Sequence, residues 1–160
     1  MFLFLNYTFG LFNIIFSLAI YVAISYSLYS IGKRNNVSNS WLAFVPIVQY
    51  YIIGSICEEY IIFDIKIPKL KYTMILLAFL QTLLSIMGGF SVWVLDILLN
   101  IIIALIMHKF YYLFDPRSAT LYGVLTLLGK IPMAIILYLI KDKSILMSAG
   151  AFPYPFEHRP

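Results

Sequence analysis

The sequence alternates long apolar runs with short polar connectors. A helix rises 1.5 Å per residue, so about 20 apolar residues cross the roughly 30 Å hydrocarbon core of a bilayer. The pattern therefore predicts an all-α fold, a polytopic membrane helical bundle with four transmembrane helices. The runs expected to span are residues 8–31, 72–88, 90–114 and 119–140.

Composition supports a membrane class. The 160 residues are 62% hydrophobic and 11% charged, with a mean hydropathy of +0.94. A soluble domain of this length could not bury so much apolar surface, so much of it is expected to face the lipid bilayer. The formal charge of +4 is spread over short groups between apolar runs, which argues against a nucleic-acid partner and for a role in membrane orientation.

The charges in the connectors between the apolar runs predict how the chain is oriented in the membrane. Residues 1–32 carry no charge and lack the basic start of a secretory signal, so we expect a retained helix with its N-terminus outside the cell. Lys33 and Arg34 follow, which places the 33–71 loop in the cytoplasm. Gly88-Gly89 predicts a tight reversal between two spans, and the Pro-rich residues 148–160 predict an extended tail after a single domain at 1–147.

The segment 41–56 is free of charge, slightly short for a span and interrupted by Pro46, which predicts an interfacial or re-entrant helix. If it turns back, seven basic residues are cytoplasmic and three are outside. If it crosses, five lie on each side, so the positive-inside rule favours re-entry. A break at residues 129–132 would make a second re-entrant hairpin and bring the C-terminal cations inside, and this alternative stays open. The interface candidates are Trp41, Pro46, Tyr50, Tyr51 and Gly54.

Polar residues inside the apolar runs recur at helical spacing. Such stripes let helices hydrogen-bond to one another, and they could also line a pathway for a small solute. Asp96 and Lys130 are the charges within spans, and because their expected depths nearly coincide we predict an ion pair between them. The stripes are Asn13, Ser17, Tyr21 and Ser25, then Gln81 and Ser85, then Asp96, Asn100, Ala104 and His108.

Catalytic and metal-binding patterns are not found. Glu58-Glu59 resembles the start of the double-glutamate motif of membrane-embedded CAAX-type proteases, but Phe63 stands where that family needs arginine. There is no nucleophile elbow, zinc-binding His-Glu pair or phosphate-binding glycine loop. Cys57 is expected to pack as a small apolar residue. We expect no enzyme, cofactor or metal, and a salt-bridged connector built from Glu58, Glu59, Asp64, Lys66, Lys69 and Lys71.

Residues 41–143 resemble a family of small uncharacterised polytopic membrane proteins of low-GC Gram-positive bacteria. The resemblance rests on a tryptophan, a Pro-Ile step and a Tyr-x-x-Gly pattern at Trp41, Pro46 and Tyr51 to Gly54, followed by an apolar hairpin. Gln49 departs from that family, which often has asparagine there. The resemblance implies a topology and no activity.

We therefore predict a non-enzymatic accessory or scaffold subunit of a larger membrane complex, such as a transporter, with other integral membrane subunits as partners. Thirteen tyrosines and thirteen phenylalanines offer wide contact surfaces. The second hypothesis is a small solute or ion carrier or channel that acts as a homo-oligomer through its polar stripes.

Overall fold

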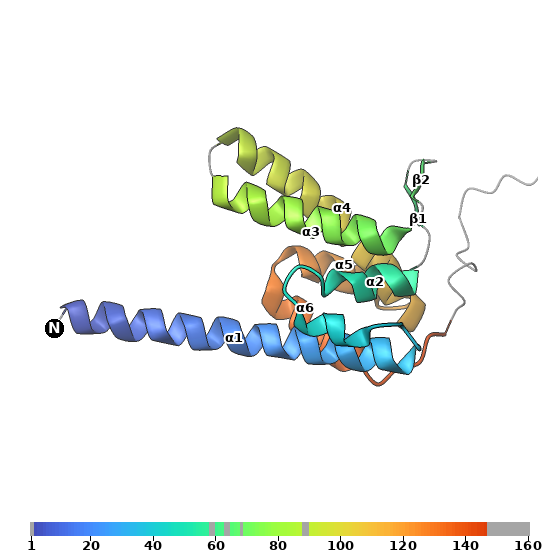
Figure 1. Ribbon diagram of the computed structural model, residues 1–160, viewed down its shortest axis with the longest axis horizontal. Coiled ribbons are helices and arrows are strands. Elements are labelled where there is room, and N and C mark those ends of the chain that lie inside the picture. The colour runs from blue at the N-terminus through green and yellow to red at the C-terminus, as the bar shows by residue number, and fades with distance from the viewer. Residues whose placement is uncertain (1, 58–59, 63–64, 68, 88–89, 147–160) are drawn as a thin grey trace, which may run out of the picture.

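The computed structural model describes residues 2–57, 60–62, 65–67, 69–87 and 90–146 (Figure 1). Within these residues the chain is almost entirely helical, so the all-α class is confirmed. Several expectations fall outside the described residues: the pair Glu58-Glu59, Asp64, the Gly88-Gly89 reversal and the tail at 148–160.

The elements include three long helices, four short ones and one small hairpin of strands. Strands β1 and β2 pair antiparallel, with Tyr60 opposite Ile67. In chain order the elements are α1 (Phe2–Arg34), η1 (Ser40–Phe44), α2 (Tyr50–Cys57), β1 (Tyr60–Ile62), β2 (Ile65–Ile67), α3 (Leu70–Met87), α4 (Phe90–Phe114), α5 (Ala119–Leu127) and α6 (Lys130–Ile140).

The long helices α1, α3 and α4 form the frame of the molecule. Their 33, 18 and 25 residues correspond to lengths of about 50, 27 and 37 Å. Two stretches of the described residues, Gly10–Arg34 and Trp93–Phe114, are long and apolar enough to cross a membrane, and α3 contributes a shorter apolar stretch, Leu70–Leu84. Length and composition thus support two of the four predicted spans.

Residues 40–57 fold back on themselves, and we call them the η1–α2 hairpin. η1 runs back along α1: Ser40 lies against Gly32, and the hydroxyl of Tyr21 donates a hydrogen bond of 2.5 Å to the carbonyl of Phe44. The chain then reverses at residues 45–49, and α2 returns in the opposite direction (Figure 1). Pro46 has no N–H to continue a helix, which explains why the segment is two short helices rather than one.

The last apolar run also folds back, which corrects the single span expected at 119–140. α5 ends at Leu127 and α6 begins at Lys130, and we call residues 119–140 the α5–α6 hairpin. Gly129 between them has φ 125° and ψ −169°, a conformation that essentially only glycine adopts. The two ends of the hairpin meet, because Lys143 Nζ lies 2.7 Å from Asp115 Oδ2 and the Leu146 amide donates to the Leu113 carbonyl at 2.9 Å.

The ends of four helices gather at one end of the molecule. Arg34 hydrogen-bonds to the backbone carbonyl of Asp142 and lies 3.5 Å from its carboxylate, and Lys109 Nζ donates a 3.2 Å hydrogen bond to the carbonyl of Cys57. The first contact joins α1 to Asp142, just after the end of α6. The second joins α4 to α2. We call this the basic end, because it holds Lys33, Arg34, Lys109, Arg117, Lys141 and Lys143.

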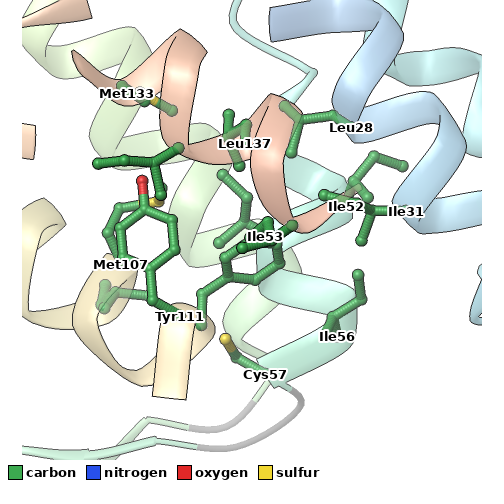
Figure 2. Packing of buried hydrophobic residues seen from close by; sticks show 14 of the residues in the cluster. Leu28, Ile31, Ile52, Ile53, Ile56, Cys57, Met107, Tyr111, Met133 and Leu137 are labelled. Carbon is green, nitrogen blue, oxygen red and sulfur yellow. The ribbon is translucent and has the colours of Figure 1, made fainter. Parts of the chain in front are cut away.

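The apolar core lies in the half of the molecule next to the basic end. Figure 2 shows side chains of α1, α2, α4 and α6 packed together there. In the other half, every side chain from Gly10 to Ala19 of α1 is exposed, and most described apolar side chains near the α3–α4 junction are exposed too. The core residues labelled in Figure 2 are Leu28, Ile31, Ile52, Ile53, Ile56, Cys57, Met107, Tyr111, Met133 and Leu137.

Candidate functional site

A cavity of about 620 Å³ lies between the turns of the two hairpins and the three long helices. Its volume falls within the range of small-molecule sites. Its polar lining includes hydroxyl, amide and ammonium groups. The lining residues are Ser17, Ile20, Tyr21 and Ile24 of α1; Pro46, Ile47, Gln49 and Tyr50; Ala78, Gln81 and Thr82 of α3; Asn100, Ile103 and Ala104 of α4; and Thr126, Leu127, Gly129, Lys130 and Met133.

The two hairpin turns place helix beginnings at the cavity. The first turn contains Ile47, which has φ 69°, and leads into α2 at Tyr50. The second contains Gly129 and leads into α6 at Lys130. Because each hairpin reverses partway along the long helices, α2 and α6 both begin beside the cavity rather than at an end of the molecule (Figure 1).

A chain of hydrogen bonds crosses one wall of the cavity. Gln81 Nε2 donates to Asn100 Oδ1 at 2.8 Å, which ties α3 to α4. Asn100 Nδ2 in turn donates to the backbone carbonyl of Asp96 at 2.8 Å and to its Oδ2 at 3.2 Å. The other carboxylate oxygen, Asp96 Oδ1, is buried without a hydrogen-bonding partner among the described residues. Asn100 is thus held in one orientation, and Asp96 lies one helical turn beyond it.

The structure does not form the predicted ion pair between Asp96 and Lys130. In the part of the chain that is described, no carboxylate lies within 4 Å of the Lys130 ammonium. Lys130 lines the cavity and Asp96 does not. The expected depths assumed that residues 119–140 form one straight helix. Since the chain reverses at Gly129, Lys130 lies at the tip of a hairpin instead.

The chain matches no family model, no curated protein and no solved structure. The resemblance to small membrane proteins of low-GC Gram-positive bacteria therefore stays a prediction. What the site can do follows from its geometry alone.

The cavity is closed toward the basic end by packed side chains. Tyr111 of α4 lies under it, and its hydroxyl is 3.0 Å from Thr126 Oγ1, which itself donates to the Tyr122 carbonyl at 2.8 Å. Tyr111, Ile53 and Leu137 are fully buried in the core (Figure 2).

The candidate residues from the sequence divide into two groups. Gln81, Asn100, Lys130, Pro46 and Tyr50 line the cavity, whereas Asp96, His108, Trp41, Tyr51 and Gly54 do not.

The second group has other surroundings. His108 packs against Gly123 and lies 3.4 Å from the hydroxyl of Thr120, which joins α4 to α5. Trp41 is exposed, and the Lys71 ammonium lies over the ring of Tyr51 at 5.8 Å. The His108 contacts and the contact between Lys71 and Tyr51 lie outside the cavity lining.

Gly54 of α2 has a structural role that the sequence reading did not find. A Cβ at Gly54 would lie 2.5 Å from Lys71 Cα and 2.8 Å from the Leu70 carbonyl oxygen, so α2 and the start of α3 touch through their backbones. The signal was present, since a lone glycine within an apolar segment often marks such an approach. Its partner could not be named from one sequence.

Proposed function

We propose that this chain is a multi-pass protein of the cell membrane in which α1, α3 and α4 cross the bilayer and both hairpins enter from the basic end and return. The exposed apolar residues support this. Leu11, Phe12, Ile14 and Ile15 of α1 are 58 to 66% exposed, and water would penalise so continuous an apolar surface. Non-helical turns at membrane depth are tolerated where they line a cavity, as both hairpin turns do here.

The basic end is cytoplasmic in this proposal, and the N-terminus is outside. Residues 1–32 and 72–95 carry no charge, whereas the basic end holds Lys109 of α4 and the cations that follow α1, α4 and α6. The fold-back of the α5–α6 hairpin adds Lys141 and Lys143 to the same side, which strengthens the positive-inside bias beyond the seven-to-three count made from the sequence.

We propose that the function is to bind a small polar solute, as a carrier or as the solute-binding subunit of a transport complex. The observation that carries this is the cavity, which lies partway along the spanning helices and is lined by groups such as Gln81, Asn100 and Lys130. Polar groups at this depth are costly unless they serve a partner or a pathway. Tyr111 is fully buried against Thr126 at the edge of the cavity, and this packing supports a binding site rather than a permanently open channel.

A second role, as an accessory subunit of a larger membrane complex, is favoured by one feature. The half of α1 from Gly10 to Ala19 is exposed on all sides, so another integral membrane subunit could pack there without displacing any part of this chain. Purification in mild detergent separates the roles, because the accessory role requires co-purifying membrane subunits and the carrier role does not.

Cysteine labelling tests the cavity directly. Cys57 is fully buried, so the natural chain should give little background. Ser17 and Thr82 line the cavity, and their neighbours Leu18 and Leu83 are exposed but lie outside it. A membrane-impermeant maleimide added outside intact cells should label Ser17→Cys and Thr82→Cys, because thiolates form in water and not in lipid.

The matched controls Leu18→Cys and Leu83→Cys should stay unlabelled, since lipid covers them in the proposed arrangement. If all four positions label equally, the surface is in water and the membrane proposal fails. If the Ser17 and Thr82 variants also resist labelling, no water-filled cavity exists and solute binding there is excluded.

A further inference from the structure

Asp96 is an acidic residue within an apolar helix, and the chain around it supplies no opposite charge. It lies about 9 Å along α4 from Phe90, inside the stretch Trp93–Phe114 that is long enough to cross a membrane. In the part of the chain that the structure describes, no ammonium or guanidinium group lies within 4 Å of its carboxyl group. Helix α3 packs along α4 and carries no charge from residue 72 to 87 (Figure 1). An ionised carboxylate is costly in such surroundings.

The other titratable groups of the neighbouring elements do not pair with Asp96. His108 lies more than three turns farther along α4 and packs against Gly123 of α5. Lys130 begins α6 and makes no ion pair among the described residues. No described side chain therefore neutralises the carboxyl group.

The hydrogen bonds of Asp96 satisfy one carboxyl oxygen and leave the other without a partner. Asn100 Nδ2 donates to Oδ2 at 3.2 Å and to the Asp96 backbone carbonyl at 2.8 Å. Because a backbone carbonyl only accepts, the second bond fixes the N–H group of Asn100, and not its oxygen, toward Asp96. Asp96 Oδ1 is enclosed and meets no donor within the described residues.

The enclosure of Oδ1 limits what can neutralise it. Metal cations that bind carboxylates take several oxygen ligands at once, but Asn100 presents an N–H group, and the described residues contain no group of three metal-ligating side chains. An ammonium group of another chain is too large for an oxygen that water does not reach. A proton needs no such space, and on Oδ1 it removes the charge without disturbing the bonds of Asn100.

Asn100 connects this carboxyl group to the cavity. Asn100 lines the cavity, and its Oδ1 accepts a 2.8 Å hydrogen bond from Nε2 of Gln81, which lines the cavity too. If Asp96 loses a proton, the bond from Asn100 becomes charge-assisted and roughly twice as strong. A solute that contacts Asn100 or Gln81 therefore changes proton binding at Asp96, and the proton changes solute binding by the same factor.

We propose that Asp96 is a proton-binding site, neutral in this arrangement of the helices with the proton on Oδ1, and that its proton is coupled to the occupant of the cavity. This rests on the proposed solute-binding function and names a proton as the second ligand. Binding forms one O–H bond with a proton from water, and release breaks that bond and returns the proton to water. Release requires α3 and α4 to separate until water reaches Oδ1, so proton exchange and a change in the cavity wall occur together.

Infrared spectroscopy of the protein in nanodiscs tests the protonation. A protonated carboxyl group has a C=O stretching band that a carboxylate lacks. At neutral pH we expect such a band in the natural chain and its loss in Asp96→Asn. Asp142→Asn is the matched control, because the Asp142 side chain is 74% exposed beside Arg34 at the basic end, and it should keep the band.

Two infrared results would overturn the proposal. A natural chain without a band that Asp96→Asn removes would mean that Asp96 is ionised. Loss of the band when sodium replaces choline in the buffer would assign the site to a metal cation. In either case, labelling of Ser17→Cys would still support the solute-binding cavity.

Maleimide labelling at a series of pH values tests the coupling. Thr82 of α3 and Ser17 of α1 both line the cavity, and the ratio of the labelling rates of Thr82→Cys and Ser17→Cys largely cancels the ionisation of the thiols. Because α3 moves when Asp96 exchanges its proton, we expect this ratio to change with pH in the natural background and to stay constant in Asp96→Asn. The same pH dependence in both backgrounds would overturn the coupling.

Discussion

The two halves of α1 are similarly apolar and have opposite surroundings. From Gly10 to Ala19 every side chain is exposed, whereas Ile24, Leu28 and Ile31 are buried against η1, α2 and α6. Hydrophobicity alone does not separate them. The difference arises because the two hairpins reach only partway along α1. Only the half of α1 near the basic end therefore packs against other elements.

The packed half of α1 needs more than hydrophobicity to stay associated with its neighbours. In lipid, an apolar side chain gains little by leaving the solvent, so close packing and polar contacts must stabilise the association of helices. The packed half has such features, including the backbone contact at Gly54 and the buried side chains around Leu28. The exposed half of α1 should therefore tolerate changes that the packed half does not.

Gly54→Ala should have the largest effect. Its new Cβ would overlap the backbone of Lys71, which cannot move without separating α2 from α3. We expect a loss of about 3 kcal/mol in the free energy of unfolding, measured by denaturant titration in detergent. Gly10→Ala in the exposed half is the matched control, because nothing lies within 4 Å of its added Cβ, and it should cause no loss. Equal losses would remove the distinction between the halves.

Leu28→Ala should destabilise the protein by about 2 kcal/mol, because it leaves a void in packing that is completely buried. Leu18→Ala makes the same chemical change where the side chain is 59% exposed, and lipid can fill the space. We expect it to change stability by less than about 0.5 kcal/mol in the same denaturant titration. A loss at Leu18 as large as that at Leu28 would mean that the exposed half has a partner in the purified protein.

Gly129→Ala should cost about 1.5 kcal/mol through backbone strain, since open space surrounds the new methyl group and φ 125° does not suit a side chain. The denaturant titration used for Leu28 measures this loss. An unchanged stability would show that the α5–α6 turn adopts another conformation, and with it another position for Lys130.

The smallest effect concerns pH at the basic end. The hydrogen bond from Lys143 holds the pKa of the Asp115 carboxyl below its ordinary value. A lowered folded pKa means that the pair stabilises the protein above the unfolded pKa, near 4, and that this contribution is lost as pH falls through the folded pKa.

The pair is partly exposed, so Lys143→Gln should lower stability by only about 0.5 kcal/mol at pH 7, with the difference disappearing below about pH 3. Unfolding midpoints across this pH range measure it. Lys33→Gln is the control, because the Lys33 side chain forms no ion pair among the described residues. A difference that grows as the pH falls would contradict the lowered pKa.

The sequence predicted the helices from their apolar runs and raised the reversal near Gly129 only as an alternative. Glycine and proline at residues 129–132 permit a turn, but the same residues occur in kinked spans, so periodicity could not decide. The contact between Asp115 and Lys143 decides it, and this contact depends on tertiary structure.

The candidate site was only partly predictable for the same reason. Helical spacing selected Gln81 and Asn100, which line the cavity, but it also selected Asp96 and His108, which do not. Lys130, selected as a charge within a predicted span, lines the cavity too. A polar stripe identifies which face of a helix carries the polar residues, but not which other helices lie against that face. The cavity itself depends on where the hairpins end, and no local pattern carries that information.

The fold-back of residues 119–140 is tested most directly by finding on which side of the membrane the α5–α6 hairpin begins and ends. Arg117→Cys and Ser144→Cys place single accessible thiols before α5 and after α6, and both positions are exposed. We expect an impermeant maleimide to label neither thiol in intact cells and to label both after the membrane is permeabilised. Labelling of one thiol in intact cells, with protection of the other, would show that the run crosses the membrane and would contradict the hairpin and the cavity built on it.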